Sequence, residues 1–340
     1  MSRVSYIDVV RGASILLIVF LHVGFVQNNM WYFERFSFVV PMFFLLSGLF
    51  FNAEVNFKQF TIKKIDTLLK PYFVVLISLG VMIHFRQGFD GFFNYVFGVV
   101  YGVGSSIPWT PMWFIPHLFI LNLIAWLVVR LISARQGGSL SLLDLVFSCL
   151  FGYLFFLVVE LYFLEPVKVS IGYLGLPFSF DYIFLSLFYF FVGVVYKKEI
   201  LNFRFNIFYF LVSIFVVVAE YYLFRGAMDF NMRRFDSFFS VCASSFAGIY
   251  LIFSVSIFLS KFIFMKSMLL YVGKISLFIL MFHVFFVKKI EGFFDVLGFN
   301  SAMLWPLVIV ISVLSCAIIY EITLRVKPFS ILLLPKSTGS

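Results

Sequence analysis

Long apolar segments follow one another along almost the whole sequence and leave little room for a water-soluble fold. Hydrophobic residues make up 63% of the chain and charged residues 12%, whereas soluble domains average about 45–50% and about 25%. A bilayer accepts apolar side chains on the outside of a fold, and a helix there satisfies its own backbone. Since a spanning helix needs about 20 apolar residues, we expect an all-α integral membrane protein of about ten transmembrane helices.

The loops between these segments are too short to fold by themselves, so we expect one transmembrane domain covering residues 1–340. Cytoplasmic loops are enriched in Lys and Arg, and roughly two-thirds of these residues fall inside if the N-terminus is cytoplasmic. Both termini are therefore predicted to be cytoplasmic. The expected segments are residues 7–27, 36–53, 71–86, 112–132, 141–163, 181–197, 206–224, 238–260, 268–288 and 302–321.

The net charge of +9 comes mostly from these short loops, so membrane topology explains it better than a nucleic-acid partner does. The three cysteines, Cys149, Cys242 and Cys316, lie far apart, without a CxxC or zinc-ligand spacing. We therefore expect no metal site, no disulfide and no nucleic acid. Residues 87–111 are too apolar for an ordinary loop and too rich in glycine for a firm helix, which predicts a re-entrant or interfacial segment.

The first apolar segment carries three polar residues, Asp8, Arg11 and His22. At about 100° per residue, Arg11 and His22 would share one face of a helix, about 16 Å apart along its axis. Asp8 lies one turn before Arg11 and leans toward the same side. On one interpretation, His22 is a general base and Arg11 stabilises negative charge. On the other, Arg11 marks the cytoplasmic end of the helix and His22 fills a buried contact.

The pattern of these residues resembles the membrane-bound acyltransferase family 3, and in particular its polysaccharide O-acetyltransferases without an appended hydrolase domain. The opening YIDVVRGASILLIVFLHV is similar to the family's in Asp8, Arg11, Gly12 and His22. Four further stretches follow in the family's order: PMFFLLSGLFF, TIKKIDTLLKPYF, MWFIPHLFILNL and YVGKISLFILMFHVFF. Together the five stretches extend over residues 6–286.

The resemblance implies that an acetyl group passes from cytoplasmic acetyl-CoA to a glycan at the outer side of the bacterial inner membrane. Acetyl-CoA would be a donor substrate, with no permanently bound cofactor. His22 and Arg11 would be catalytic, with Asp8 and Ser47 in supporting roles. The Ser47-Gly48 pair also has a simpler interpretation, because small residues let membrane helices pack closely.

Four lysines are candidates for holding the acyl-CoA: Lys63, Lys64, Lys70 and Lys274. Many family members carry two arginines three residues apart in this basic segment. Here Lys64 takes the first place and Thr67 the second. A lysine cannot supply the bidentate fork of an arginine, so the grip on the CoA phosphates would differ from the family's.

Three aromatic or imidazole side chains are candidates for binding the acceptor: Trp113, His117 and His283. A sugar ring can stack on Trp113, although an interfacial tryptophan can also serve as a membrane anchor. On one continuous helix over 268–288, Lys274 and His283 would face opposite sides, since nine residues correspond to about 900°.

Two other classes of function stay open from the sequence. A transporter or flippase of a glycan or lipid-linked intermediate would show inverted repeats and paired broken helices, and the sequence has no clear repeat. A membrane scaffold or sensor would not need His22. The expected partners are acetyl-CoA, a glycan or lipid-linked glycan, and membrane lipids, while the sequence leaves the oligomeric state undetermined.

Overall fold

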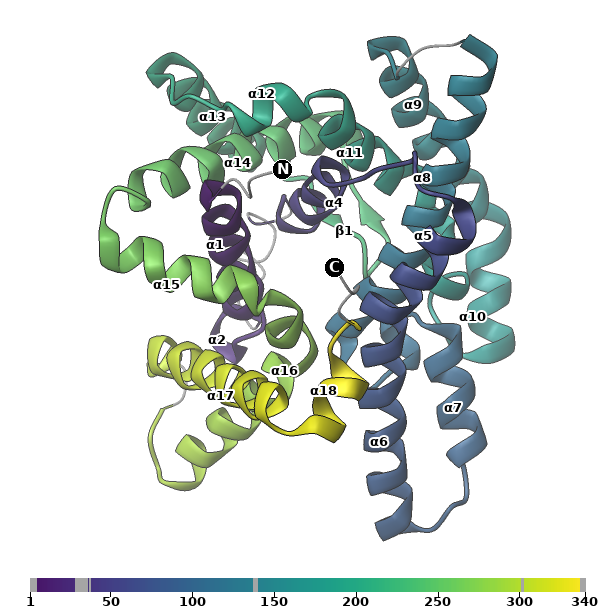
Figure 1. Ribbon diagram of the computed structural model, residues 1–340, viewed down its shortest axis with the longest axis vertical. Helices are drawn as coiled ribbons and strands as arrows, with labels where there is room; N and C mark the ends of the chain where they lie inside the picture. The colour runs from purple at the N-terminus through teal and green to yellow at the C-terminus, as the bar shows by residue number, and fades with distance from the viewer. Residues whose placement is uncertain (1–4, 28–35, 37, 137–139, 301–302, 337–340) are drawn as a thin grey trace. The chain divides into compact units, whose positions relative to one another are not determined.

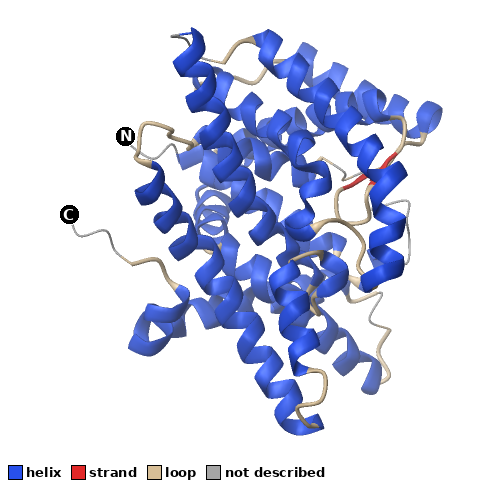
Figure 2. Cartoon of the chain, turned by 90° about the vertical axis from the view of Figure 1, so that its right-hand side faces the viewer, coloured by secondary structure: helices blue, strands red, loops and turns tan. Residues whose placement is uncertain are grey.

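The computed structural model describes residues 5–27, 36, 38–136, 140–300 and 303–336. These residues are almost entirely helical (Figure 2), which confirms the all-α expectation. Within the described ranges, the only strands are β1 (Met228–Asp229) and β2 (Arg234–Phe235), which pair antiparallel in a small hairpin.

Among the described residues, seven helical segments are long and apolar enough to cross a membrane, or eight if a bent pair counts as one span. The protein is therefore a multi-pass membrane protein. Two further expected spans are short: α1 (Ser5–Leu21) has 17 residues and α4 (Val39–Leu49) has 11. The count of about ten is not confirmed, and the orientation of the termini stays a prediction. The seven segments are Phe57–Gln87, Thr110–Ser133, Leu142–Ile171, Pro177–Val195, Ile207–Phe224, Phe238–Leu259 and Trp305–Arg325.

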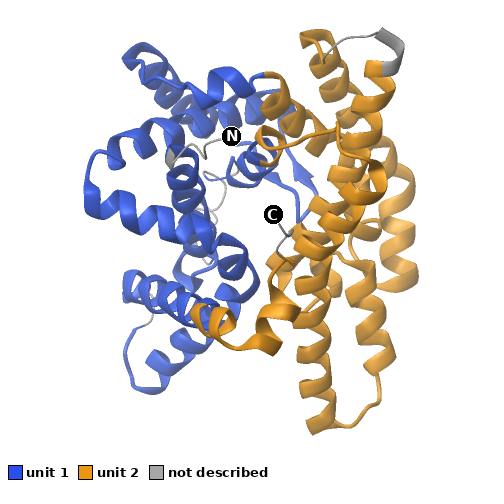
Figure 3. Ribbon diagram, in the orientation of Figure 1, with its two compact units in different colours: residues 1–46, 196–320 blue, residues 47–195, 321–340 orange. Residues whose placement is uncertain are grey.

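The chain divides into two compact units, coloured separately in Figure 3. Unit 1 comprises residues 1–46 and 196–320, and unit 2 comprises residues 47–195 and 321–340. The three boundaries fall within α4, directly after residue 195, and within α17 (Trp305–Arg325). The expected single domain stays a prediction.

In unit 1, α1 packs along α15 and also contacts α14 and α16, while α13 packs on α14 (Figure 1). The close approach of α1 and α15 depends on two glycines of the family-like motifs. A Cβ atom on Gly12 would collide with the Leu269 carbonyl, and one on Gly273 would collide with the Asp8 carbonyl. Besides α1 and parts of α4 and α17, unit 1 contains α2 (Gly24–Gln27), α12 (Lys197–Leu201), α13 (Ile207–Ala219), η6 (Glu220–Phe224), α14 (Phe238–Leu259), α15 (Ile263–Lys274) and α16 (Ser276–Val296).

Gly12→Ala is therefore expected to destabilise unit 1, because α15 must move away to admit the methyl group. Overpacking of this kind costs about 1–3 kcal/mol. Gly292→Ala is the matched control, since a Cβ atom on Gly292 meets nothing within 4 Å. Thermal unfolding of both variants in detergent checks this, and equal midpoints would contradict the close packing.

Unit 2 uses glycines in the same way. A Cβ atom on Gly48 would collide with the Phe190 carbonyl of α11, and one on Gly152 of α9 would lie 2.7 Å from the Leu185 nitrogen. The Ser47-Gly48 pair thus includes a small-residue packing position, and a supporting role for Ser47 stays a prediction. The helices of unit 2 are α5 (Phe57–Lys64), η1 (Ile65–Leu69), α6 (Lys70–Gln87), α7 (Phe92–Tyr101), η2 (Gly104–Ser106), η3 (Thr110–Trp113), α8 (Phe114–Gln136), α9 (Leu142–Val159), η4 (Glu160–Leu164), α10 (Glu165–Ile171), η5 (Pro177–Tyr182), α11 (Ile183–Val195) and α18 (Lys327–Leu333).

The glycine-rich connection over 87–111 contains the short helix α7, which folds back along α6 (Figure 1). Two tyrosine hydroxyls fix this antiparallel register. The Tyr95 hydroxyl donates to the Leu76 carbonyl, and the Tyr72 hydroxyl donates to the Val99 carbonyl, each at 2.7 Å. With 10 residues, α7 is too short to span a bilayer. This length agrees with a re-entrant or interfacial segment. The depth of α7 in the membrane stays a prediction.

Candidate active site

Arg11 is held by an ion pair on its own helix. Its Nη1 atom lies 3.4 Å from Asp8 Oδ1, one turn earlier on α1. The Asp8 side chain is 8% exposed and the Arg11 side chain 26%, so a buried carboxylate orients a half-buried guanidinium. An ion pair one turn apart on a helix adds modest stabilisation.

His22 lies directly after the end of α1, which corrects the expectation of one helix over 7–27. The helix ends at Leu21, and the short helix α2 begins at Gly24. The His22 backbone N–H donates to the Val19 carbonyl at 3.0 Å in a tighter turn than an α-helix makes. The predicted helix face shared by Arg11 and His22 assumed a helix that includes both residues, whereas α1 ends one residue before His22.

A backbone carbonyl fixes the proton on the His22 ring. Nδ1 lies 2.7 Å from the Ile18 carbonyl oxygen, and because a carbonyl can only accept, Nδ1 carries the hydrogen. Nε2 of the neutral ring is then unprotonated and has a free lone pair. This is the tautomer that a general base or a nucleophile requires.

His283 of α16 lies beside His22, with ring centroids 4.9 Å apart and ring planes at 82°. Its Nδ1 lies 2.6 Å from the Ile279 carbonyl oxygen, so Nδ1 again carries the hydrogen. His283 is fully buried, and its Nε2 has no hydrogen-bond partner among the described residues. The site therefore holds two imidazoles, each with an unprotonated Nε2.

Lys274 and His283 do not share one helix, so their predicted placement on opposite faces of a helix over 268–288 is wrong. α15 and α16 meet at an angle of 85°. The break is at Ile275, whose backbone leaves the helical region with φ −94° and ψ 11°. Lys274 ends α15, and its Nζ lies 5.6 Å from the centre of the Tyr320 ring. Its role in binding CoA stays a prediction.

The basic segment with Lys63, Lys64 and Lys70 belongs to one continuous helical stretch in unit 2, although it falls between the expected segments 36–53 and 71–86. The π-helix η1 joins α5 to α6, and such π-turns often lie at functional sites. At the position of the family's second arginine, the Thr67 hydroxyl donates to the Lys63 carbonyl at 2.8 Å.

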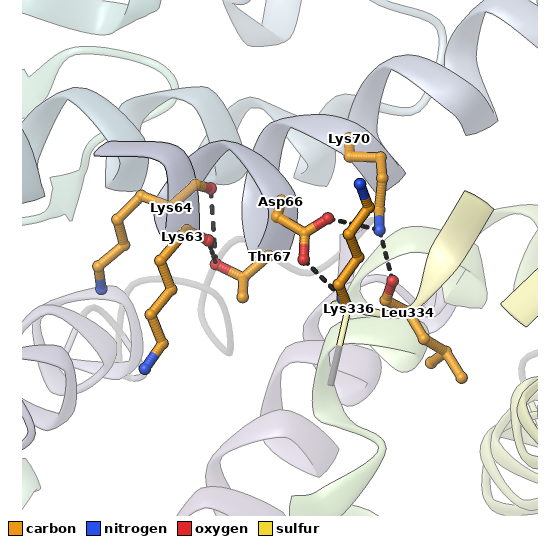
Figure 4. A network of polar contacts seen from close by, with 7 residues as sticks. All are labelled: Lys63, Lys64, Asp66, Thr67, Lys70, Leu334 and Lys336. Carbon is orange, nitrogen blue, oxygen red and sulfur yellow. Dashed lines mark hydrogen bonds and ion pairs between the residues drawn. The ribbon is translucent and has the colours of Figure 1, made fainter. Parts of the chain in front are cut away.

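Lys70 is bound by the chain itself, as Figure 4 shows. Its Nζ lies 2.7 Å from Asp66 Oδ1 and 2.5 Å from the Leu334 carbonyl oxygen. The Lys336 backbone N–H donates to Asp66 Oδ2 at 2.6 Å. Asp66 and Lys70 thus fasten residues 334–336 to the start of α6, and we call this group the C-terminal clasp. The side chains of Lys63 and Lys64 point away from it (Figure 4).

Asp66→Ala is expected to release the end of the chain, since both Lys70 and the Lys336 amide lose an acceptor. Hydrogen exchange of residues 327–336 should then become at least about tenfold faster, as the loss of about 1.4 kcal/mol would produce. Glu165→Ala is the control, because the Glu165–Lys168 pair is exposed on both sides and contributes little. Unchanged exchange in Asp66→Ala would show that the clasp does not hold the segment.

The proposed acceptor residues Trp113 and His117 lie together in unit 2, with ring centroids 5.8 Å apart. His117 is fully buried, and both of its ring nitrogens are used within unit 2. Nδ1 donates to the Phe178 carbonyl at 3.0 Å, and Nε2 accepts from the Ser186 hydroxyl at 2.8 Å. These bonds connect three helical elements, and an acceptor-binding role for either residue stays a prediction.

Two acidic residues that were not predicted from the sequence, Asp66 and Glu291, hold distant parts of the chain. Asp66 has a local signal, because it lies four residues before Lys70 on one helix face. Glu291 lies beyond the expected segment 268–288 but belongs to α16, which continues to Val296. Its partner is the Gly24 amide, 267 residues away in the sequence, and no local pattern indicates such a contact.

These features define a class of protein: a multi-pass helical membrane protein with an ion-paired arginine on its first helix. Directly after that helix lies a histidine whose ring hydrogen is fixed on Nδ1. Among the described residues, no group of three His, Cys, Asp or Glu could hold a metal ion. A family model described as an acyltransferase domain matches residues 4–321. The chain therefore belongs to acyltransferase family 3, and it is an acyltransferase. No curated protein and no solved structure matches the chain.

Proposed function

We propose that the protein is an O-acetyltransferase of the bacterial inner membrane. It transfers an acetyl group from cytoplasmic acetyl-CoA to a hydroxyl of a cell-envelope or extracellular polysaccharide, or of its lipid-linked precursor. The observation that carries this proposal is the unprotonated Nε2 of His22, fixed by the Ile18 carbonyl. Family membership supplies the acyl transfer, and a base of this kind suits a hydroxyl acceptor.

In the proposed reaction, His22 Nε2 removes the proton of the acceptor hydroxyl while its oxygen attacks the thioester carbonyl. The C–O bond forms, the C–S bond breaks, and CoA leaves as a thiolate that takes up a proton. Arg11 stabilises the negative charge that develops on the carbonyl oxygen. The same Nε2 atom also suits a two-step mechanism. In it, Nε2 first attacks the thioester, and the acetyl group then passes from His22 to the sugar.

The donor side of the proposal uses Lys63 and Lys64, whose side chains are not part of the C-terminal clasp (Figure 4). Lys63 is exposed, and the Lys64 ammonium lies 5.3 Å from the centre of the Phe60 ring. Both can meet the CoA phosphates as point charges. Lys70 can do so only by exchanging its partners in the clasp, and Lys274 at the end of α15 is a further candidate.

On the acceptor side, His283 lies beside His22, and an acceptor hydroxyl could donate to its Nε2 only after the fully buried ring became accessible. In unit 2, Trp113 is a separate candidate for stacking on a sugar ring, but its side chain is buried, so the packing around it would have to open first. His117 holds that region through its two buried hydrogen bonds. Each of these groups is proposed as an acceptor contact within its own unit.

The test is to express the protein in cells with defined envelope glycans and to analyse the extracted glycans by mass spectrometry and NMR. The expected result is one added acetyl group per modified sugar, carried on oxygen and removed by mild alkali. Labelled acetyl-CoA supplied to the cytoplasmic side of membrane vesicles should label the same glycan. If export of a glycan changes without acetylation, a transporter or flippase takes the place of this proposal.

A further inference from the structure

The turn that carries His22 needs support from outside α1, because the helix has already ended at Leu21. Within the turn, the His22 amide and ring bond only to carbonyls of the preceding helical turn. A catalytic group must be held closely, since a misplacement of about 1 Å can lower a rate about 10²-fold. A group from another element must therefore fix the chain after His22.

Glu291 of α16 supplies this support. The Gly24 backbone N–H donates to Glu291 Oε1 at 2.7 Å. The carboxylate closes tightly on this residue, because a Cβ atom on Gly24 would lie 3.3 Å and 3.4 Å from its two oxygens. A carboxyl oxygen that accepts this amide hydrogen can fix the backbone two residues after His22.

The same helix also positions the His22 ring. His283 and Glu291 are eight residues apart on α16, which corresponds to about 80° around the helix axis. One side of α16 therefore places an imidazole against His22 and a carboxylate against Gly24. The two contacts lie on either side of the Val23 peptide and leave the turn little freedom.

We infer that Glu291 is a positioning residue for His22, acting through the Gly24 amide. This inference rests on the proposed function, because it assigns to Glu291 the task of placing the His22 Nε2 for acyl transfer. The group that matters is an oxygen acceptor at this place, and the chemistry requires no proton exchange by Glu291.

Four variants test the inference in purified protein reconstituted in vesicles, with acetyl-CoA and the acceptor glycan. Glu291→Leu removes the acceptor and should lower kcat about 10- to 100-fold, with the KM for acetyl-CoA little changed. Glu291→Gln keeps an oxygen acceptor and should restore most of kcat. Gly24→Pro removes the donor at the first position of α2 and should be at least as slow as Glu291→Leu, because its Cβ atom also presses on the Glu291 oxygens. Asp295→Leu, one turn further on an exposed site, is the control and should behave like wild type.

The double variant Gly24→Pro/Glu291→Leu should be no slower than the slower single variant, because both remove the same bond. Wild-type kcat in Glu291→Leu, equal impairment of Glu291→Gln and Glu291→Leu, or multiplied losses in the double variant would each overturn the inference.

A second readout separates this inference from the proposed function. Diethyl pyrocarbonate modifies unprotonated imidazole, and peptide mass spectrometry follows its rate at His22 without any acyl transfer. Glu291→Leu should change this rate severalfold and Glu291→Gln should leave it near wild type. If wild type transfers no acetyl group but this pattern holds, the proposed function fails and the positioning of His22 by Glu291 stands. If the rate at His22 is the same in all variants, the positioning fails.

Discussion

His22→Ala is expected to lower the rate of acyl transfer by about 10²- to 10⁴-fold, the usual contribution of a general base. The variant loses the Nε2 atom that takes the hydroxyl proton, and the buried site around His283 offers water no equally placed substitute. The loss should appear in kcat, because the ring is proposed for the chemical step and CoA binding is proposed for lysines. Initial rates of CoA release, followed with a thiol reagent on protein in vesicles, measure it.

The control for His22→Ala is His84→Ala, which removes an imidazole between α6 and α7 in unit 2. That variant should retain wild-type rates when its level in the membrane matches. If His22→Ala transfers acetyl groups as fast as wild type, the assignment of His22 is wrong, and His283 becomes the base to examine.

Arg11→Ala is expected to cost about 10²- to 10³-fold in kcat, comparable with the removal of one donor from an oxyanion-binding site. Arg11→Lys should recover only part of this, because a lysine retains the charge but loses the planar fork that can contact Asp8 and a second group together. Asp8→Asn should be milder than Arg11→Ala, since it loosens the guanidinium without removing it. Initial rates measured in the same vesicles rank the three variants.

Arg204→Ala is the control for these variants, because it removes an exposed arginine from another part of unit 1. Equal rates in Arg11→Ala and Arg204→Ala would contradict the role of Arg11. Equal rates in Arg11→Lys and wild type would show that charge alone is sufficient.

Much of the membrane fold could be predicted because apolar length is a direct physical requirement of a bilayer. The helices α8, α9, α11, α13, α14 and α17 lie where the apolar segments place them, within a few residues at most ends. The segment containing Lys274 and His283 shows the limit. A break at Ile275 leaves the hydropathy unchanged, so composition cannot distinguish one straight helix from two that meet at 85°.

The site was predictable only where its chemistry is local. Asp8 and Arg11 are one turn apart on one helix, so their ion pair follows from the spacing. The neighbours of His22 are different, because His283 and Glu291 come from a helix more than 260 residues later. His283 was singled out by its motif and Glu291 by nothing, and only the packing of α1 against α16 brings both to the same turn.

The distance in sequence between Gly24 and Glu291 also sets an order of events during synthesis. At about 5–20 residues per second, the ribosome needs tens of seconds after completing α1 to produce α16. During that interval α1 waits in the membrane without its permanent neighbours, and Arg11 would be an isolated charge. The Asp8–Arg11 pair needs no later residue, so it forms as soon as the helix does and lets α1 wait as a neutral pair. A nascent chain cannot form the Gly24–Glu291 hydrogen bond until α16 has been made, so in the proposed mechanism His22 is not yet positioned when α1 first enters the membrane.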